Sequence, residues 1–174
     1  MSIYNIITIP DPVLKTAASP VSKVDDALRA QLDGMLQTMY DAPGIGLAAN
    51  QVGLLNRVFV MDLTLREDKE GPRKPVFIIN PEIIWESEDI SVMEEGCLSI
   101  PHQFAEVQRP ASVRLKYLDY NGAEQEMLAE GLAAHCVQHE LDHLDGILFI
   151  DHLSALKRNM ILKRVEKMKK QDLL

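Results

Sequence analysis

The segment QHELDHLDG, residues 138–146, contains two histidines four positions apart, with a glutamate directly after the first. Positions i and i+4 of a helix lie on one face, so His139 and His143 can chelate one metal ion. Glu140 can then reach a water bound to that ion and act as a general base. The spacing predicts metal-dependent hydrolysis if a third ligand exists, because catalytic sites keep three protein ligands and one open position. The alternative is a pair of buried histidines with ordinary hydrogen bonds.

Four residues compete for the third position. Phe149 stands where the longer H-E-x-x-H-x-x-G-x-x-H pattern requires histidine, so that pattern is incomplete. Glu166 would provide the carboxylate of a thermolysin-like metallopeptidase. Cys136 shares the helical face of the histidines, but it lies about 7.5 Å along the axis from their midpoint, too far for a short side chain. Cys97, in EEGCLSIP before a short β-type run ending at Pro101, would provide a thiolate.

Two helices are predicted around these residues. The helix with the histidines opens after Gly131, is rich in Leu and Ala, and closes at Gly146, a typical C-cap. An earlier helix is expected from Asp25 to about Asp41, because apolar residues recur there on one stripe. The central helix therefore carries the candidate metal ligands.

Strands are predicted between the two helices. RVFVMD and PVFIIN are short β-type runs, and REDKEGPRK, residues 66–74, is expected to be a surface loop between them. SVRLKYLDY alternates in polarity before Asn121-Gly122, the strongest short hairpin signal, and EQEMLAE follows. We therefore predict an α+β fold, with antiparallel β-strands packed around the central metal-binding helix and with N-terminal and C-terminal helices.

The composition suits a single catalytic domain, residues 1–174. The chain is 47% apolar, and no linker divides it. Its start, MSIYNIITIPDP, lacks the features of a signal peptide, and no run of 18 apolar residues suggests a membrane helix. Two cysteines are too few for a disulfide scaffold. We expect a cytoplasmic protein with neither DNA nor a membrane among its partners.

Charge is unevenly distributed along the chain. The net charge is -8, but residues 153–174 contain seven Lys and Arg against two acidic residues, a local +5 that leaves -13 for the rest. Ser154 is a candidate N-cap for a basic C-terminal helix there. Its basic side chains would form a solvated outer face or attract RNA phosphates. The apolar residues expected to dock this helix are Leu153, Leu156, Met160, Ile161, Val165 and Met168.

Three motifs together resemble peptide deformylase: GIGLAANQVG at 44–53, EGCLSIP at 95–101 and QHELDHLDG at 138–146. The resemblance extends from IPDPVL near the start to the helix after FIDHLS. It implies that Cys97, His139 and His143 hold the metal, with Fe(II) as the natural ion and Zn, Ni or Co as replacements. The implied reaction is hydrolysis of a linear amide. It removes the formyl group from the N-terminal formylmethionine of newly synthesised polypeptides and releases formate, with Glu140 as proton shuttle.

The resemblance also implies how the substrate binds. The side-chain amide of Gln51 and the backbone N–H of Leu98 are expected to donate to the oxyanion that forms at the formyl group. Gly44 and Gly46, on either side of Ile45, are expected to let an extended peptide backbone approach closely. The methionine side chain is expected in an apolar pocket near Ile45, Met93, Leu132, Cys136 and His139.

Further residues either support this resemblance or depart from it. Glu95 and Arg109 match an ion pair of the family. His135 occupies a pocket-side position that is apolar in some relatives. His102 leaves a rival interpretation open, because as a fourth ligand it would close the metal shell and make a structural site in a non-enzymatic module. In relatives a C-terminal helix contacts the ribosome, so the resemblance implies possible ribosome contact through residues 153–174.

Overall fold

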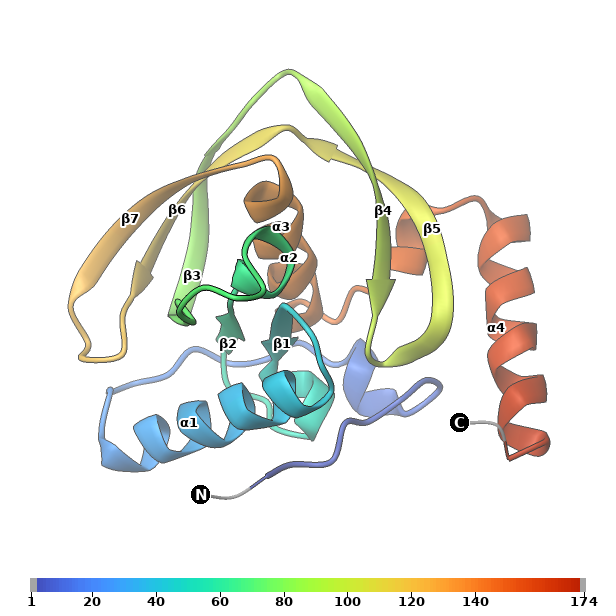
Figure 1. Ribbon diagram of the computed structural model, residues 1–174, viewed down its shortest axis with the longest axis horizontal. Helices are drawn as coiled ribbons and strands as arrows, with labels where there is room; N and C mark the ends of the chain where they lie inside the picture. The colour runs from blue at the N-terminus through green and yellow to red at the C-terminus, as the bar shows by residue number, and fades with distance from the viewer. Residues whose placement is uncertain (1–2, 173–174) are drawn as a thin grey trace.

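Two antiparallel sheets form the framework of the molecule, and the computed structural model describes residues 3–172 (Figure 1). Five strands pair in the order β1-β2-β3-β6-β7, and β4 and β5 form a separate two-stranded sheet. The predicted hairpin around Asn121-Gly122 is confirmed, because β6 and β7 pair across it. The strands are β1 Gly46–Ala48, β2 Val58–Met61, β3 Val76–Glu86, β4 Ile90–Cys97, β5 Ile100–Pro110, β6 Ser112–Leu118 and β7 Glu124–Glu130.

Helix α3 (Leu132–Leu144) lies between the five-stranded sheet and the β4–β5 hairpin (Figure 1). Residues 134–140 are all buried, so the helix is covered on every side rather than along one stripe. Val137 packs with Phe59 and Leu115 of the sheet in one core cluster. The predicted central helix is confirmed, and Gly146 follows it with φ 75°, the left-handed conformation that favours glycine after a helix.

Helix α1 (Asp26–Asp41) packs against β1 and β2. The Asp25 carboxylate accepts a hydrogen bond from the Leu28 N–H at 2.9 Å, which satisfies one of the free donors of the first turn. The predicted stripe is buried at Leu28, Leu32, Met35 and Met39. Because only residues 42–45 connect α1 to β1, the packing of this helix also fixes the glycine-rich segment at 44–46.

The β4–β5 hairpin was not predicted from the sequence. Its register runs from Ile90 opposite Pro110 to Cys97 opposite Ile100. The expected β-type run ending at Pro101 is therefore wrong, because β5 begins there and continues to Pro110. Ile90 and Phe104 are 58% and 63% exposed, so apolar residues occupy both faces and blur the period-two pattern that identifies a strand.

Helix α4 (Ala155–Lys170) begins at Ser154, whose hydroxyl accepts a hydrogen bond from the Lys157 N–H at 3.2 Å. Ile161 and Val165 are buried with residues of β5 in a second core cluster. Leu156 and Met160, predicted on the docking face, are instead 73% and 44% exposed. The helix therefore docks through a narrower stripe than predicted. Residues 1–2 of the predicted domain and residues 173–174 of its basic segment lie outside the described residues.

The predicted surface loop at 66–74 begins inside a short helix, α2 (Thr64–Glu67). Asp62 stabilises its first residue, because one carboxylate oxygen accepts hydrogen bonds from the Thr64 N–H at 2.9 Å and from its hydroxyl at 2.6 Å. Arg66 therefore lies on a helical turn and not in a loop. Within residues 3–172, no helix combines the length and the apolar character that crossing a bilayer demands.

Candidate metal centre and substrate cavity

Cys97, His139 and His143 come together although the cysteine lies on a strand and the histidines on a helix. Cys97 ends β4, and the two histidines lie one turn apart on α3. Their candidate ligand atoms all lie within 4.8 Å of one another, and Cys97 Sγ is 3.3 Å from His143 Nε2. The three residues predicted as ligands thus form one group that can hold a metal ion.

The donor atoms of this group fit a divalent ion that accepts sulfur and nitrogen. Thiolate and imidazole suit iron, zinc, cobalt and nickel, whereas magnesium and calcium prefer oxygen. The His139 ring is oriented by its Nδ1, 3.0 Å from Glu95 Oε1, which leaves Nε2 for a metal. Burial lowers the pKa of His143 well below its usual range, so this imidazole is in the neutral form that binds metals.

Glu95 links the strand and the helix that carry these residues. It lies two positions before Cys97 and forms a buried ion pair with Arg109 on β5, with Nε–Oε2 2.7 Å and Nη2–Oε1 2.9 Å. Burial alone would raise the pKa of Glu95, but hydrogen bonds from Arg109 and His139 keep it well below its usual range. The carboxylate is therefore ionised, and the expected Glu95–Arg109 pair is confirmed.

Glu140 is a buried carboxylate beside the metal group. It is 4% exposed, and its Oε1 has no hydrogen-bond partner among the residues that the structure describes. Burial raises the pKa of Glu140 to about 7. A Cβ atom placed on Gly46 would lie 2.5 Å from Glu140 Oε2, so the carboxylate rests directly against the glycine backbone. A carboxyl group with these properties can both accept and release a proton near neutral pH.

The two predicted oxyanion donors lie beside Cys97. Gln51 belongs to a short 3₁₀ helix, Ala49–Val52, and its Oε1 accepts a hydrogen bond from the Ala48 N–H at 3.0 Å. Its Nε2 donates to Ser99 Oγ at 3.1 Å and to Cys97 Sγ at 3.6 Å. Leu98 lies in the turn between β4 and β5. The Gln51 amide is therefore oriented, and in this structure its N–H groups point to protein atoms.

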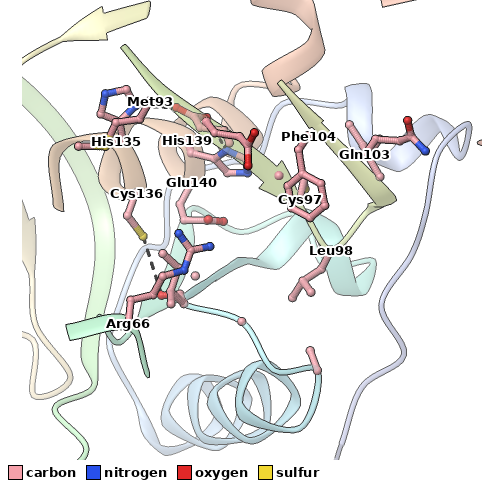
Figure 2. Close-up of a pocket in the computed structure, with 18 of the residues that line it drawn as sticks. Arg66, Met93, Cys97, Leu98, Gln103, Phe104, His135, Cys136, His139 and Glu140 are labelled. Atoms are coloured by element: carbon pink, nitrogen blue, oxygen red, sulfur yellow. Dashed lines mark hydrogen bonds and ion pairs between the residues drawn. The ribbon is translucent and has the colours of Figure 1, made fainter. Parts of the chain in front are cut away.

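A cavity of about 500 Å³ opens beside these residues. Figure 2 shows Glu140 and His139 between Cys136 on one side and Cys97 on the other. Three further residues that line this cavity were not predicted from the sequence, namely Arg66, Gln103 and Phe104. No local signal marks Arg66, whereas Gln103 and Phe104 would have followed from recognising β5. The lining includes every residue predicted to bind substrate, namely Gly44, Ile45, Gly46, Met93, Leu132 and Cys136.

Comparison with known proteins decides which family has this site. Residues 3–159 match the family described as polypeptide deformylase. The chain belongs to the polypeptide deformylase family. The peptide deformylase of Mesorhizobium japonicum is 58% identical to it over 170 residues, covering 98% of this chain and 95% of that protein. The peptide deformylase of Phenylobacterium zucineum is 56% identical over 167 residues, covering 96% of this chain and 97% of that protein.

Solved structures of peptide deformylases share the fold. The crystal structure of the Ehrlichia chaffeensis enzyme superposes with a TM-score of 0.93 at 38% identity, covering 99% of this chain and 100% of that one. The Legionella pneumophila enzyme gives a TM-score of 0.90 at 41% identity, covering 99% and 98% of the two chains. The predicted α+β architecture is therefore that of the deformylase family.

The geometry also rules out the competing interpretations for this deformylase. Glu166 is exposed on α4 and pairs with Lys170 at 3.4 Å, so it is no metal ligand. His102 lines the cavity but does not belong to the group of candidate ligands, so a closed four-ligand shell is not formed. Phe149 packs against His139 with ring centroids 6.1 Å apart, and Cys136 points its Sγ to the carbonyl oxygen of Ile45 at 3.8 Å.

Proposed function

We propose that the chain catalyses deformylation, hydrolysing the amide that joins the formyl group to the N-terminal methionine of newly synthesised polypeptides and releasing formate. One observation carries this proposal: the cavity lined by Cys97 and His139 of the candidate ligand group is also lined by the buried carboxylate of Glu140. Membership of the deformylase family supports the same reaction. Because its substrates are chains that leave the ribosome, we place its action in the cytoplasm.

We assign Cys97, His139 and His143 as the protein ligands of the metal. Fe(II) is the ion that we propose for the cell, with Zn, Ni or Co as replacements, since thiolate and imidazole accept all of them. A divalent ion held there supplies Lewis acidity, which activates water and polarises an amide carbonyl. The position of the Cys97 sulfur in the group and the oriented ring of His139 support this assignment, because the hydrogen bond between His139 Nδ1 and Glu95 leaves Nε2 for the metal.

Glu140 is assigned as the group that moves protons. Its pKa of about 7 lets the carboxylate accept a proton from the attacking water and then deliver it to the departing amine nitrogen. The amide nitrogen needs this proton because an amine anion is too poor a leaving group. Oε1 is the natural site for the proton, since it has no other hydrogen-bond partner among the described residues.

The substrate backbone is proposed to bind along β1. This strand is an edge of the five-stranded sheet, so the segment that begins at Gly44 can pair with an extended peptide. The opposite wall of the cavity is formed by the end of β4 and the turn at Leu98. The methionine side chain is proposed to occupy the apolar part of the cavity, lined by Ile45, Met93, Leu132 and Cys136.

Two donors are proposed to stabilise the developing oxyanion. The backbone N–H of Leu98 faces no acceptor within residues 3–172 and is available to the substrate oxygen. Gln51 Nε2 already lies at the cavity wall, 3.6 Å from Cys97 Sγ, and we propose that one of its N–H groups turns to the substrate. A donor of this kind contributes about 100- to 1000-fold in rate.

The reaction is tested by measuring formate release from formyl-Met-Ala-Ser with Fe(II)-loaded protein prepared without oxygen. We expect formate without cleavage of internal peptide bonds, because the proposed reaction hydrolyses only the amide of the N-terminal formyl group. An N-acetylated peptide of the same sequence is the matched control, and its hydrolysis should be slow. Cleavage of an internal bond, or no formate from protein with a full complement of metal, would contradict the proposal.

We further propose that α4 contacts the ribosome. Lys163, Arg164 and Lys167 are exposed on this helix and form no ion pair within the described part of the chain. Unpaired cations on one rigid helix attract RNA phosphates, and the attraction weakens steeply with salt. The acidic remainder of the protein would face away from the RNA for the same electrostatic reason.

Charge reversal on α4 tests this contact. Lys163→Glu with Lys167→Glu should lower cosedimentation with ribosomes at low salt by about tenfold or more, because each lost phosphate contact removes attraction. Formate release from the tripeptide should not change. The control reverses Arg114 and Lys116, exposed cations of β6, and alters the net charge equally. Equal losses in the two double variants would show that only net charge matters, and no loss would leave α4 as a solvated surface.

A further inference from the structure

The Glu95 carboxylate accepts four hydrogen bonds, and one of them comes from a residue without a role in the proposed reaction. Arg109 donates two, and His139 Nδ1 lies 3.0 Å from Oε1. The fourth partner is His135, whose Nδ1 lies 2.8 Å from Oε2. An ionised carboxylate has about four acceptor sites, so this carboxylate is saturated. His135 therefore completes the set of bonds that fixes Glu95.

The hydrogen bond to Glu95 determines which atom of the His135 ring donates to the carboxylate. An ionised carboxylate can only accept, so the proton lies on His135 Nδ1. The other nitrogen, Nε2, lies within hydrogen-bond distance of Ser91 Oγ, at 3.1 Å. The side chain is 3% exposed, and both nitrogens have partners. This ring cannot turn without breaking a hydrogen bond to β4, the strand that carries both Ser91 and Glu95.

The position of this ring relates it to the metal group. His135 and His139 lie one turn apart on α3 and bind the two oxygens of the same carboxylate. Cys97 follows Glu95 by two residues on β4. The candidate metal ligands are thus divided between a strand and a helix, and Glu95 bridges the two. Any rotation of its carboxylate would shift the ring of His139 relative to the sulfur of Cys97.

We propose that His135 is a positioning residue for the metal centre. By holding Glu95 Oε2, it keeps Oε1 in place for His139 and keeps the end of β4 at a fixed distance from α3. This inference rests on the proposed metal site. It differs from a simple packing role, because it requires a donor at the position of Nδ1 and not merely a side chain of suitable volume.

Three substitutions of His135 separate the two roles. Asparagine places an amide N–H near the position of Nδ1 and can still donate to Glu95. Glutamine places its amide near the position of Nε2 and retains a partner for Ser91 instead. Leucine fills the space without any donor. If His135 acts through Glu95, the asparagine variant keeps the metal, and the other two variants lose it faster.

The experiment measures release of Co(II) from the loaded protein into excess chelator, followed by the thiolate-to-cobalt absorption band. His135→Leu and His135→Gln should release cobalt about tenfold faster than wild type, the lower end of the effect of groups that orient a metal ligand. His135→Asn should stay within about twofold of wild type. No substrate is present, so changes in the cavity wall do not contribute to the readout.

Gln138→Leu is the matched control, because this buried side chain of α3 bonds only the carbonyl oxygens of Pro110 and Ala134. Its release rate should equal that of wild type. Equal rates in all three His135 variants, retention by glutamine rather than asparagine, or fast release by the control would overturn the inference. Wild-type protein that does not hold cobalt would overturn the proposed metal site as well, so the two failures are distinguishable.

Discussion

Replacing Glu140 with glutamine is expected to lower the rate of formate release by about 100- to 10,000-fold, the usual contribution of a general acid–base group. Glutamine has nearly the same shape as glutamate but cannot take up a proton. The effect should appear in kcat rather than in KM, because the carboxylate acts on the reacting atoms. The natural group suits this task because burial raises the pKa of Glu140 to about 7.

The same variant should retain its metal. Glu140 is not one of the clustered ligands Cys97, His139 and His143, so its loss leaves the metal group intact. Metal content per chain, measured together with kcat, therefore separates a proton-transfer role from a ligand role. Glu94→Gln is a matched control, since Glu94 also lines the cavity but is exposed. Loss of metal in Glu140→Gln, or equal loss of activity in the control, would contradict the assignment.

The sequence predicted best those parts of the site that depend on local spacing. His139 and His143 share one helical face, so a four-residue interval was sufficient to place both in the candidate ligand group. Cys97 is different, because its approach to the histidines depends on how the β4–β5 hairpin folds over α3. Nothing in the local pattern around Cys97 expresses that long-range packing. Only the resemblance to a family distinguished it from Glu166.

The errors have a common physical cause. The helical period of α4 was correct, yet Leu156 and Met160 are exposed, because a period cannot tell whether a surface exists for a side chain to cover. Arg66 was expected in a loop and instead lines the cavity from a short helix. In each case the local sequence indicates the type of element at most. Whether a side chain is exposed or lines the cavity depends on contacts with residues far away in the chain.

The role of the glycines was also only partly predictable. Gly44 and Gly46 were expected to admit a peptide backbone, but the structure gives each glycine a neighbour within the protein. A Cβ atom on Gly46 would approach Glu140 Oε2 to 2.5 Å, whereas one on Gly44 would meet the Leu98 Cδ1 atom at 2.8 Å. Gly46 therefore makes room for the proposed proton shuttle, and Gly44 for a cavity-wall side chain.

This difference predicts that the two glycine-to-alanine variants are not equivalent. Gly46→Ala should lower kcat by about 100-fold, because displacing a reacting group by about 1 Å has an effect of this size. The buried carboxylate of Glu140 cannot yield to the new methyl group without moving away from the substrate. Gly44→Ala meets only the far end of a half-buried leucine, which can rotate, so it should raise KM by a few-fold at most.

Neither variant should act by unfolding the protein. Gly44 and Gly46 both avoid the left-handed region of φ, so alanine is compatible with the backbone at both positions. Alanine also restricts the unfolded chain, which favours folding by about 0.4–1 kcal/mol where it fits. Melting temperature should therefore stay near the wild-type value in Gly44→Ala and fall in Gly46→Ala, where overpacking of the buried contact with Glu140 costs about 1–3 kcal/mol. Metal content should stay near the wild-type value in both variants, while kcat of the folded protein falls in Gly46→Ala alone. Equal kinetic losses in both variants would instead mean that the glycines serve a shared role in admitting the substrate backbone, and that the contact between Gly46 and Glu140 does not govern proton transfer.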